Sequence, residues 1–317
     1  MIMKNKELIN LNRRGWGKEM LKKKSLWFYM FAFIVVIAAC SETTTKNVED
    51  TKSASNSDPS SVSDLDPSDP MTPYIKDGEK IFNETDTMLP EKVGNEMACM
   101  SCHADGGTSQ GSTLVGVTGQ YPKYQPRAGT VQTIEERINS CIVRSMNGEK
   151  LEYDGEEMRS IVAYLTHISD GIAVGWDVES EQEIQIIEEI PEPSVENGEE
   201  LYEEKNCMSC HATDGSGKGV TSGPALWGAK SFSDGASLSR MKVMTNYIKN
   251  NMPEDDAGSL TDQEATDLAA FLLSKERPEW EGHENDWPEE ERPNDVITKK
   301  ERKKIQEGTF DWSKMNH

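Results

Sequence analysis

Apolar and aromatic residues are scarce in this sequence. Of its 317 residues, 35% are hydrophobic and 7% are Phe, Trp or Tyr. A chain of this length is long enough for about two domains, but its apolar content suffices only for small cores, so we expect part of it to be linker. The single long apolar run, Leu26 to Ala39, has about fourteen residues, which is short for a membrane-spanning helix.

Positive charge is scarce too. The chain has 34 Lys and Arg against 56 Asp and Glu, a net charge of −22. This balance excludes nucleic acid as a partner, because binding a polyanion depends on neutralising phosphates with Lys and Arg. A strongly acidic body suits solubility and a basic redox partner. Any local cluster of arginines is informative here, since it works against the field of the whole protein.

The N-terminus has the pattern of an export signal. Lys22 to Lys24 precede the apolar run, and small residues follow it. The ending Ile37-Ala38-Ala39-Cys40 resembles a lipobox, in which Cys40 is lipidated and becomes the first residue of the mature chain. We therefore expect an exported, periplasmic lipoprotein that contacts the membrane only through this lipid. The alternative is an uncleaved membrane anchor. Cleavage removes eight basic and two acidic residues, which moves the net charge to about −28.

Cysteine is rare, and its placement is specific. Four of the six cysteines belong to two Cys-x-x-Cys-His motifs, the attachment pattern of c-type haem. In this chemistry the two thiols add to the vinyl groups of one porphyrin, and the histidine ligates the iron. The motifs predict two covalently bound haem c groups, attached at Cys99 and Cys102 with His103 as iron ligand, and at Cys207 and Cys210 with His211 as iron ligand.

Two other readings of these motifs are weaker. A zinc site would need two further Cys or His ligands for each motif at ribbon or finger spacing. The remaining candidates are scattered along the chain: Cys40, Cys141, His167, His283 and His317. A thioredoxin-type redox motif would need a βαβ context, which the sequence does not suggest.

The chain repeats one plan twice. Gly78, Ile81 and Phe82 have helical spacing, and Gly198, Leu201 and Tyr202 mirror them before the second motif. Each domain also ends in an apolar-striped helix. We predict an all-α fold of two tandem cytochrome c domains, divided as a lipoprotein signal peptide (1–39), a disordered tether (40–72), a catalytic domain with haem 1 (73–169), a linker (170–193), an electron-transfer domain with haem 2 (194–277) and a C-terminal tail (278–317).

Capping patterns mark two helix starts. Thr133 with Glu136 and Thr261 with Glu264 each form a capping box. The tail carries Trp280, Trp287 and Trp312, and it either wraps over the domain interface or is partly loose. A structured cap in place of the tether is the alternative at the N-terminal end.

The sixth iron ligands decide the function, because a haem with only a histidine keeps an open site. In the second domain Met252, followed by Pro253, is the candidate, and Met244 is its rival. A His/Met pair raises the potential, which suits electron transfer. Pro224, in Gly223-Pro224-Ala225-Leu226, resembles the proline of small cytochromes c whose carbonyl orients the proximal imidazole, here His211.

The first domain has no Met-Pro after its haem motif, and Met146 and Met158 are the methionines that could serve as its ligand. Instead Arg137, Cys141 and Ser145 fall at i, i+4 and i+8 on one helical stripe, with Arg144 beside them. Arginine beside a thiol favours the thiolate, and thiolate is also an iron ligand. The alternative is a buried structural cysteine, the commoner fate of a free thiol.

At these residues the sequence resembles a known family. Gly119 to Tyr164 is similar to the dihaem thiosulfate dehydrogenases, which also act as tetrathionate reductases. The likeness rests on an arginine fourteen residues before the cysteine (Arg127), an arginine one turn before it (Arg137) and a serine one turn after it (Ser145), and it extends over both haem domains.

The resemblance implies an oxidoreductase that interconverts two thiosulfate and one tetrathionate. Haem 1 then carries a His103/Cys141 axial pair, Cys141 is both ligand and nucleophile, and electrons pass through haem 2 to a small redox protein such as a cytochrome. Arg127 and Arg137 supply paired donors to sulfonate oxygens, and Ser145 adds a hydroxyl. One departure concerns Asn251, where some members have a lysine that is an alternative ligand.

Other functions compete with this one. A non-catalytic dihaem electron carrier is the main alternative, but a carrier has no need for a thiol between two arginines. A dihaem peroxidase would need acid/base residues beside an open haem, and no such pattern is present in the sequence. A cysteine-ligated subunit of a sulfur-oxidising complex would act on a carrier protein instead of free thiosulfate.

Overall fold

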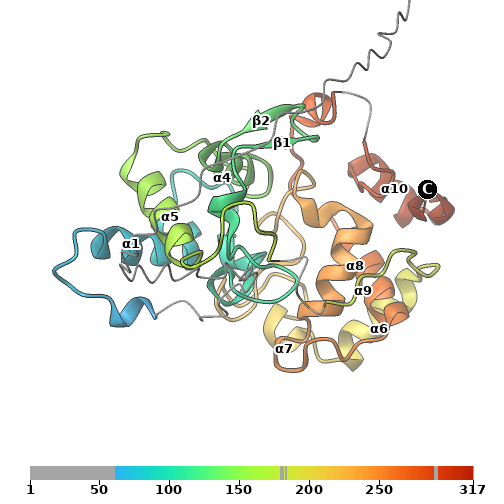
Figure 1. Cartoon of the computed structure of the whole chain (residues 1–317). Helices are drawn as coiled ribbons and strands as arrows, with labels where there is room; N and C mark the ends of the chain where they lie inside the picture. The colour runs from blue at the N-terminus through green and yellow to red at the C-terminus, as the bar shows by residue number, and fades with distance from the viewer. Residues whose placement is uncertain (1–60, 179–181, 183, 289–291, 317) are drawn as a thin grey trace, which may run out of the picture. The chain divides into compact units, whose positions relative to one another are not determined.

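The computed structural model describes residues 61–178, 182, 184–288 and 292–316, and it is helical apart from one small hairpin in this part of the chain (Figure 1). The predicted signal peptide and Cys40 lie outside the described residues. Of the helices that are described, none has the length and apolar character needed to cross a membrane. The elements are α1 (Thr72–Asn83), α2 (Thr85–Met88), α3 (Ala104–Gly107), β1 (Lys123–Gln125), β2 (Thr130–Gln132), α4 (Ile134–Arg144), α5 (Glu156–His167), α6 (Val195–Glu204), α7 (Met208–His211), α8 (Met241–Asn251), α9 (Asp262–Ser274) and α10 (Lys299–Gln306).

The first domain is built on the crossing of its first and last helices, α1 and α5. Gly78 makes the close approach possible, because a Cβ there would collide with the backbone of Ser160 in α5. Phe82 and Tyr164 pack with ring centroids 5.4 Å apart. The Tyr164 hydroxyl donates to the carbonyl of Gly106, just after the haem motif, at 2.7 Å. The crossing therefore holds the motif loop.

The second domain repeats this construction with α6 and α9. A Cβ at Gly198 would collide with the backbone of Asp267, and Tyr202 packs on Phe271 at 5.6 Å. The tyrosine hydroxyl that binds the motif loop is here on the first helix of the domain: Tyr202 donates to the carbonyl of Ala212 at 2.6 Å. α8 also packs against α9 (Figure 1). The predicted tandem arrangement is confirmed.

Helix α4 begins as predicted. Thr133 and Glu136 form the capping box, with the Thr133 amide donating to Glu136 Oε2 at 2.8 Å. Thr261 and Glu264 do the same for α9. One element departs from an all-helical fold: β1 and β2 pair antiparallel with Tyr124 opposite Val131. Their connection contains Pro126 and Gly129, whose φ is +64°, so the chain reverses there instead of running on as a loop.

The regions outside the two domains pack more than the sequence suggests. For residues 61–72 the prediction of a disordered tether is wrong, because Val62 is buried and Leu65 packs beside it on the first-domain core. In the linker Ile187 and Ile190 are buried in the core of the second domain. The tail is packed as well: α10 lies against α9, and Ile297 is 1% exposed.

Candidate functional site

Both motif histidines are held in the same way. His103 Nδ1 bonds to the Ser112 carbonyl at 2.9 Å, and His211 Nδ1 bonds to the Pro224 carbonyl at 2.8 Å. The second contact confirms the predicted role of Pro224. A carbonyl accepts only from a protonated Nδ1, so each Nε2 carries the lone pair that a metal needs. Burial also lowers the pKa of both imidazoles and keeps them neutral. The histidines therefore fit an iron-ligand role.

The surroundings of the second motif fit a porphyrin. A cavity of about 530 Å³ contacts Cys207, Cys210 and His211, and the rest of its lining is largely apolar. Met252 and Met244 both line it, so each remains a candidate ligand. Met244 is 2% exposed, whereas Met252 is half-buried at the C-terminal end of α8.

The surroundings of the first motif bring its thiols close to Cys141. Burial raises the pKa of Cys99 to about 11 and that of Cys102 to about 12, and a negative charge on Cys141 adds to both shifts. Cys141 itself is half-buried on α4, beside the packed positions Ile138 and Ile142. The third thiol of this domain therefore interacts electrostatically with its haem-attachment pair.

Arg137 contacts the Cys141 thiol directly. Its Nη1 donates to Cys141 Sγ at 2.8 Å, one helical turn along α4. The charge of a Cys141 thiolate is the main factor that raises the pKa of Arg137, and Tyr121 adds to it. Tyr121 lies before β1 and also accepts a hydrogen bond from Gln125 at 2.9 Å. Sequence reasoning missed Tyr121, because nothing in the local pattern links it to a helix that begins more than ten residues later.

The remaining predicted residues line one cavity. A space of about 350 Å³ is bordered by Arg127, Arg137 and Ser145, together with Arg144 and Arg240. Cys141 is not among the lining residues, so Arg137 is the side chain that contacts both the thiol and the cavity. Arg127 lies in the turn between β1 and β2, which explains why the hairpin matters for this site.

The C-terminal tail supplies the supporting side chains. Asp286, with a side chain 1% exposed, binds Arg127 Nη2 at 2.6 Å and Arg144 Nη2 at 3.0 Å. Trp287 lies 4.6 Å from the guanidinium of Arg127, and Trp280 lies 5.0 Å from that of Arg144. Burial lowers the pKa of Arg127, although the contact with Asp286 counteracts the effect. The tail therefore fixes two of the cavity's arginines.

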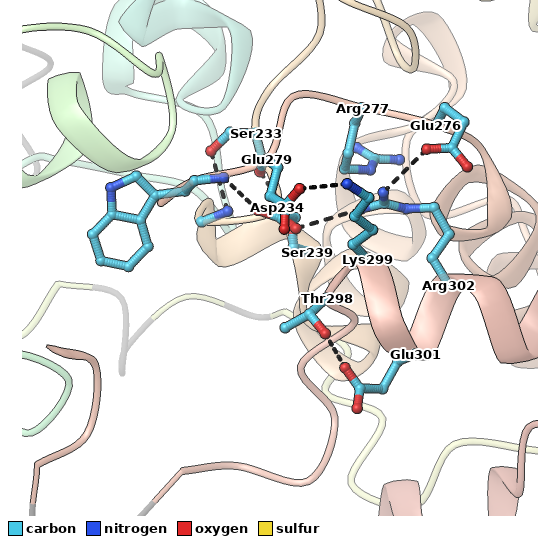
Figure 2. Close-up of polar contacts among 12 residues, drawn as sticks. Ser233, Asp234, Ser239, Glu276, Arg277, Glu279, Thr298, Lys299, Glu301 and Arg302 are labelled. Atoms are coloured by element: carbon cyan, nitrogen blue, oxygen red, sulfur yellow. Dashed lines mark hydrogen bonds and ion pairs between the residues drawn. The ribbon is translucent and has the colours of Figure 1, made fainter. Parts of the chain in front are cut away.

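A buried ionic cluster ties that tail to the second domain (Figure 2). Arg302 of α10 is 1% exposed and lies 3.8 Å from Asp234 and 3.6 Å from Glu276. Asp234 Oδ1 accepts from the amide of Trp280 and from His283 Nε2, each at 2.8 Å. Burial disfavours the Asp234 carboxylate, but these hydrogen bonds outweigh it and lower its pKa. Trp280 is thus held in position over Arg144.

The two histidine sites are joined through Asn251. Its Oδ1 accepts from the hydroxyls of Ser109 at 3.2 Å and Ser112 at 3.4 Å. Ser112 is the residue whose carbonyl orients His103, and Asn251 directly precedes Met252. The amide of Asn251 therefore forms a buried link between the domains.

Comparison with known proteins agrees with this architecture. A family model described as "SoxA/TsdA, cytochrome c domain" matches residues 77–174, and one described as "Cytochrome c" matches residues 195–276. The thiosulfate dehydrogenase of Psychrobacter arcticus is 35% identical over 235 residues, 73% of this chain and 71% of that protein. That of Allochromatium vinosum is 37% identical over 210 residues, 63% of this chain and 77% of that protein.

A solved structure has the same arrangement. Thiosulfate dehydrogenase (TsdBA) from Marichromatium purpuratum superposes with a TM-score of 0.62 at 29% identity, over 67% of this chain. This chain covers 48% of that longer chain. Two haem motifs in two cytochrome c domains define a c-type cytochrome with two covalently bound haems. The chain belongs to the thiosulfate dehydrogenase family.

Proposed function

We propose that this protein interconverts two thiosulfate and one tetrathionate, with the substrate at haem 1 and electrons passing through haem 2. Cys99, Cys102 and His103, together with Cys141, would hold haem 1, and Cys207, Cys210, His211 and Met252 would hold haem 2. The observation that carries the proposal is the 2.8 Å contact from Arg137 to the Cys141 thiol at the edge of an arginine-lined cavity.

The cavity is suited to sulfur oxyanions. Thiosulfate and tetrathionate are dianions with sulfonate groups, and planar guanidinium groups pair with such oxygens through two N–H bonds. Arg127 and Arg137 face the cavity on a protein whose net charge is −22. The hydroxyl of Ser145 borders the same space. A sulfonate bound at Arg137 brings the sulfane sulfur of thiosulfate towards Cys141.

Cys141 takes part in both steps of the reaction and is regenerated at the end. In the oxidative direction its thiolate and the sulfane sulfur of the first thiosulfate form an S–S bond, and two electrons are released. When bound, each haem iron exchanges one electron, so the pair matches this step. The sulfane sulfur of a second thiosulfate then attacks the sulfane sulfur on Cys141. Tetrathionate forms, the bond to Cys141 breaks, and the thiolate returns without gain or loss of a proton.

We also propose an exported protein anchored through a lipid on Cys40. The support is the sequence alone, since residues 1–60 lie outside the described part. The acidic surface suits a small basic redox protein as electron partner, because complementary charge speeds encounter.

The test is an anaerobic assay with thiosulfate and an artificial electron acceptor, repeated in reverse with tetrathionate and a reductant. Wild-type protein should turn over in at least one direction. Cys141→Gly should lose activity by about a thousandfold or more while both haems stay attached. Val143→Ala, a neighbouring change on α4, is the matched control. Normal turnover in Cys141→Gly would show a mere electron carrier or another catalytic residue.

A further inference from the structure

The cavity beside Arg137 holds more cationic groups than one thiosulfate requires. Four guanidinium groups border it, from Arg127, Arg137, Arg144 and Arg240. Two of them, Arg127 and Arg137, account for the first substrate sulfonate. Arg144 lies seven residues beyond Arg137, or about 10 Å along α4. Arg240 comes from the second domain, where it is the N-cap residue of α8.

Arg144 and Arg240 are each held by a buried carboxylate on the tail. Arg144 Nε and Nη2 both donate to Asp286 Oδ1, at 3.2 and 3.0 Å. Arg240 Nε donates to Asp295 Oδ1 at 2.9 Å. The contacts among the described residues therefore use one edge of each guanidinium. Both side chains border the cavity, and the N–H groups left over from these contacts are those at Nη1 of Arg144 and at both Nη atoms of Arg240.

The charge summed over the described residues of the site is positive. Four arginines stand against the thiolate of Cys141 and two carboxylates, those of Asp286 and Asp295, whose side chains are 1% and 3% exposed. Two dianions in one cavity repel each other strongly at low effective dielectric. A surplus of guanidinium groups, fixed before substrate arrives, offsets that repulsion.

The proposed reaction requires such a surplus. The second thiosulfate has to approach while the sulfonate of the first is still held near Cys141. We propose that Arg144 and Arg240, with the adjacent hydroxyl of Ser237, form a second anion subsite that binds the sulfonate of the second thiosulfate, and equally the distal sulfonate of tetrathionate. This proposal rests on the proposed function and names where its second substrate binds. It also makes both haem domains part of one substrate site.

The experiment separates the two half-reactions of the holoenzyme. Oxidised protein is mixed anaerobically with thiosulfate, and the rapid reduction of the haems is followed by absorbance before steady-state turnover with an acceptor. In Arg144→Gln and Arg240→Gln the first phase should keep its rate and amplitude, whereas turnover at low thiosulfate should fall roughly tenfold to a hundredfold. Tetrathionate binding to the oxidised protein, measured by calorimetry, should weaken to the same degree.

Two further variants control for folding. Arg240→Lys keeps the charge next to Asp295 but loses the planar pair of donors, so it should show a smaller loss. Arg159→Gln removes an exposed arginine of the first domain and should change nothing. If the first phase and turnover fall together in Arg144→Gln and Arg240→Gln, or neither falls, the second subsite is wrong. If wild-type haems are not reduced by thiosulfate and tetrathionate does not reoxidise them, the proposed function fails as well.

Discussion

Helices α4 and α8 occupy matching places in the two domains, each between the haem motif and the last helix, yet they present different chemistry. α4 carries Arg137 and Arg144 at the arginine-lined cavity, and Cys141 in contact with Arg137. α8 buries Met241, Met244 and Ile248 and ends at Met252 beside the apolar cavity of the second motif. One scaffold therefore supports a reactive site or an electron-transfer site according to the side chains on one helix.

The same comparison shows that the two domains are not independent. Arg240, the N-cap residue of α8, borders the arginine-lined cavity, and Met252, its C-cap residue, borders the cavity of the second haem motif. Asn95 of the first domain donates to the carbonyls of Ser145 and Ser231 at 3.1 and 3.0 Å, which joins the end of α4 to the second domain. A substitution on α4 or α8 should therefore affect both domains, except where it replaces an iron ligand and alters one haem alone.

The largest separable effect is expected at Met252. Under the proposed ligation, Met252→Gly removes a thioether that raises the potential of haem 2, so that potential should fall by on the order of 100 mV while haem 1 is unchanged. Spectra and redox titration of the two haems would measure this. Met244→Leu is the matched control, because it keeps the buried volume. An unaltered haem 2 in Met252→Gly and an altered one in Met244→Leu would reverse the ligand assignment.

The two helix crossings should respond equally. Gly78→Ala and Gly198→Ala place a methyl group against the backbone of Ser160 and Asp267, so each should lower the free energy of unfolding by about 3 kcal/mol. Thermal unfolding of the holoprotein would measure it. Glu203→Ala, on the exposed face of α6, should have little effect. A loss in one domain only would mean that the repeat does not extend to its packing.

Local sequence patterns predict much of this structure. The helix starts at Thr133 and Thr261 and the stripe that joins Arg137 to Cys141 follow from short-range spacing. The role of Pro224 follows from a resemblance to small cytochromes c. Asp286 does not follow, since it lies 159 residues from Arg127 and an aspartate in a charged tail has no local signature. The tryptophans at 280 and 287 were the available hint, because large aromatic residues in an otherwise polar tail indicate burial.

The third prediction concerns Asp286 of the tail, which holds two arginines of the first domain, and its effect should be confined to catalysis. Asp286→Asn removes the charge that Arg127 and Arg144 share, so kcat/KM for thiosulfate should fall by roughly tenfold to a hundredfold. The redox potential of haem 2 should stay constant. Asp154→Asn, an exposed change in the first domain, is the control. A normal kcat/KM would mean that the tail merely covers the site.

The smallest effect concerns the capping boxes. A hydrogen bond from Lys205, at 2.7 Å, and the Thr261 amide lower the pKa of Glu264 to about 2. The unfolded value is about 4.3, so this contribution to stability is present above about pH 4.3 and is lost as the pH falls towards 2. Because the pair is partly exposed to solvent, Glu264→Gln should cost under about 1 kcal/mol at pH 7.

Glu136 is the matched comparison for that change. It forms the same capping box on α4, and among the described residues no lysine pairs with it. Measuring the unfolding of Glu136→Gln and Glu264→Gln at pH 7 and pH 2.5 would separate the contribution of the capping box from that of Lys205. An equal cost of both substitutions at pH 7 would show that Lys205 adds nothing.

The central claim is that the sulfur of Cys141 ligates the iron of the first haem, and electron paramagnetic resonance of the oxidised protein tests it most directly. The account predicts a low-spin ferric signal of a histidine/thiolate pair that disappears in Cys141→Ala and persists in Met252→Gly. An unchanged set of haem signals in Cys141→Ala would contradict it.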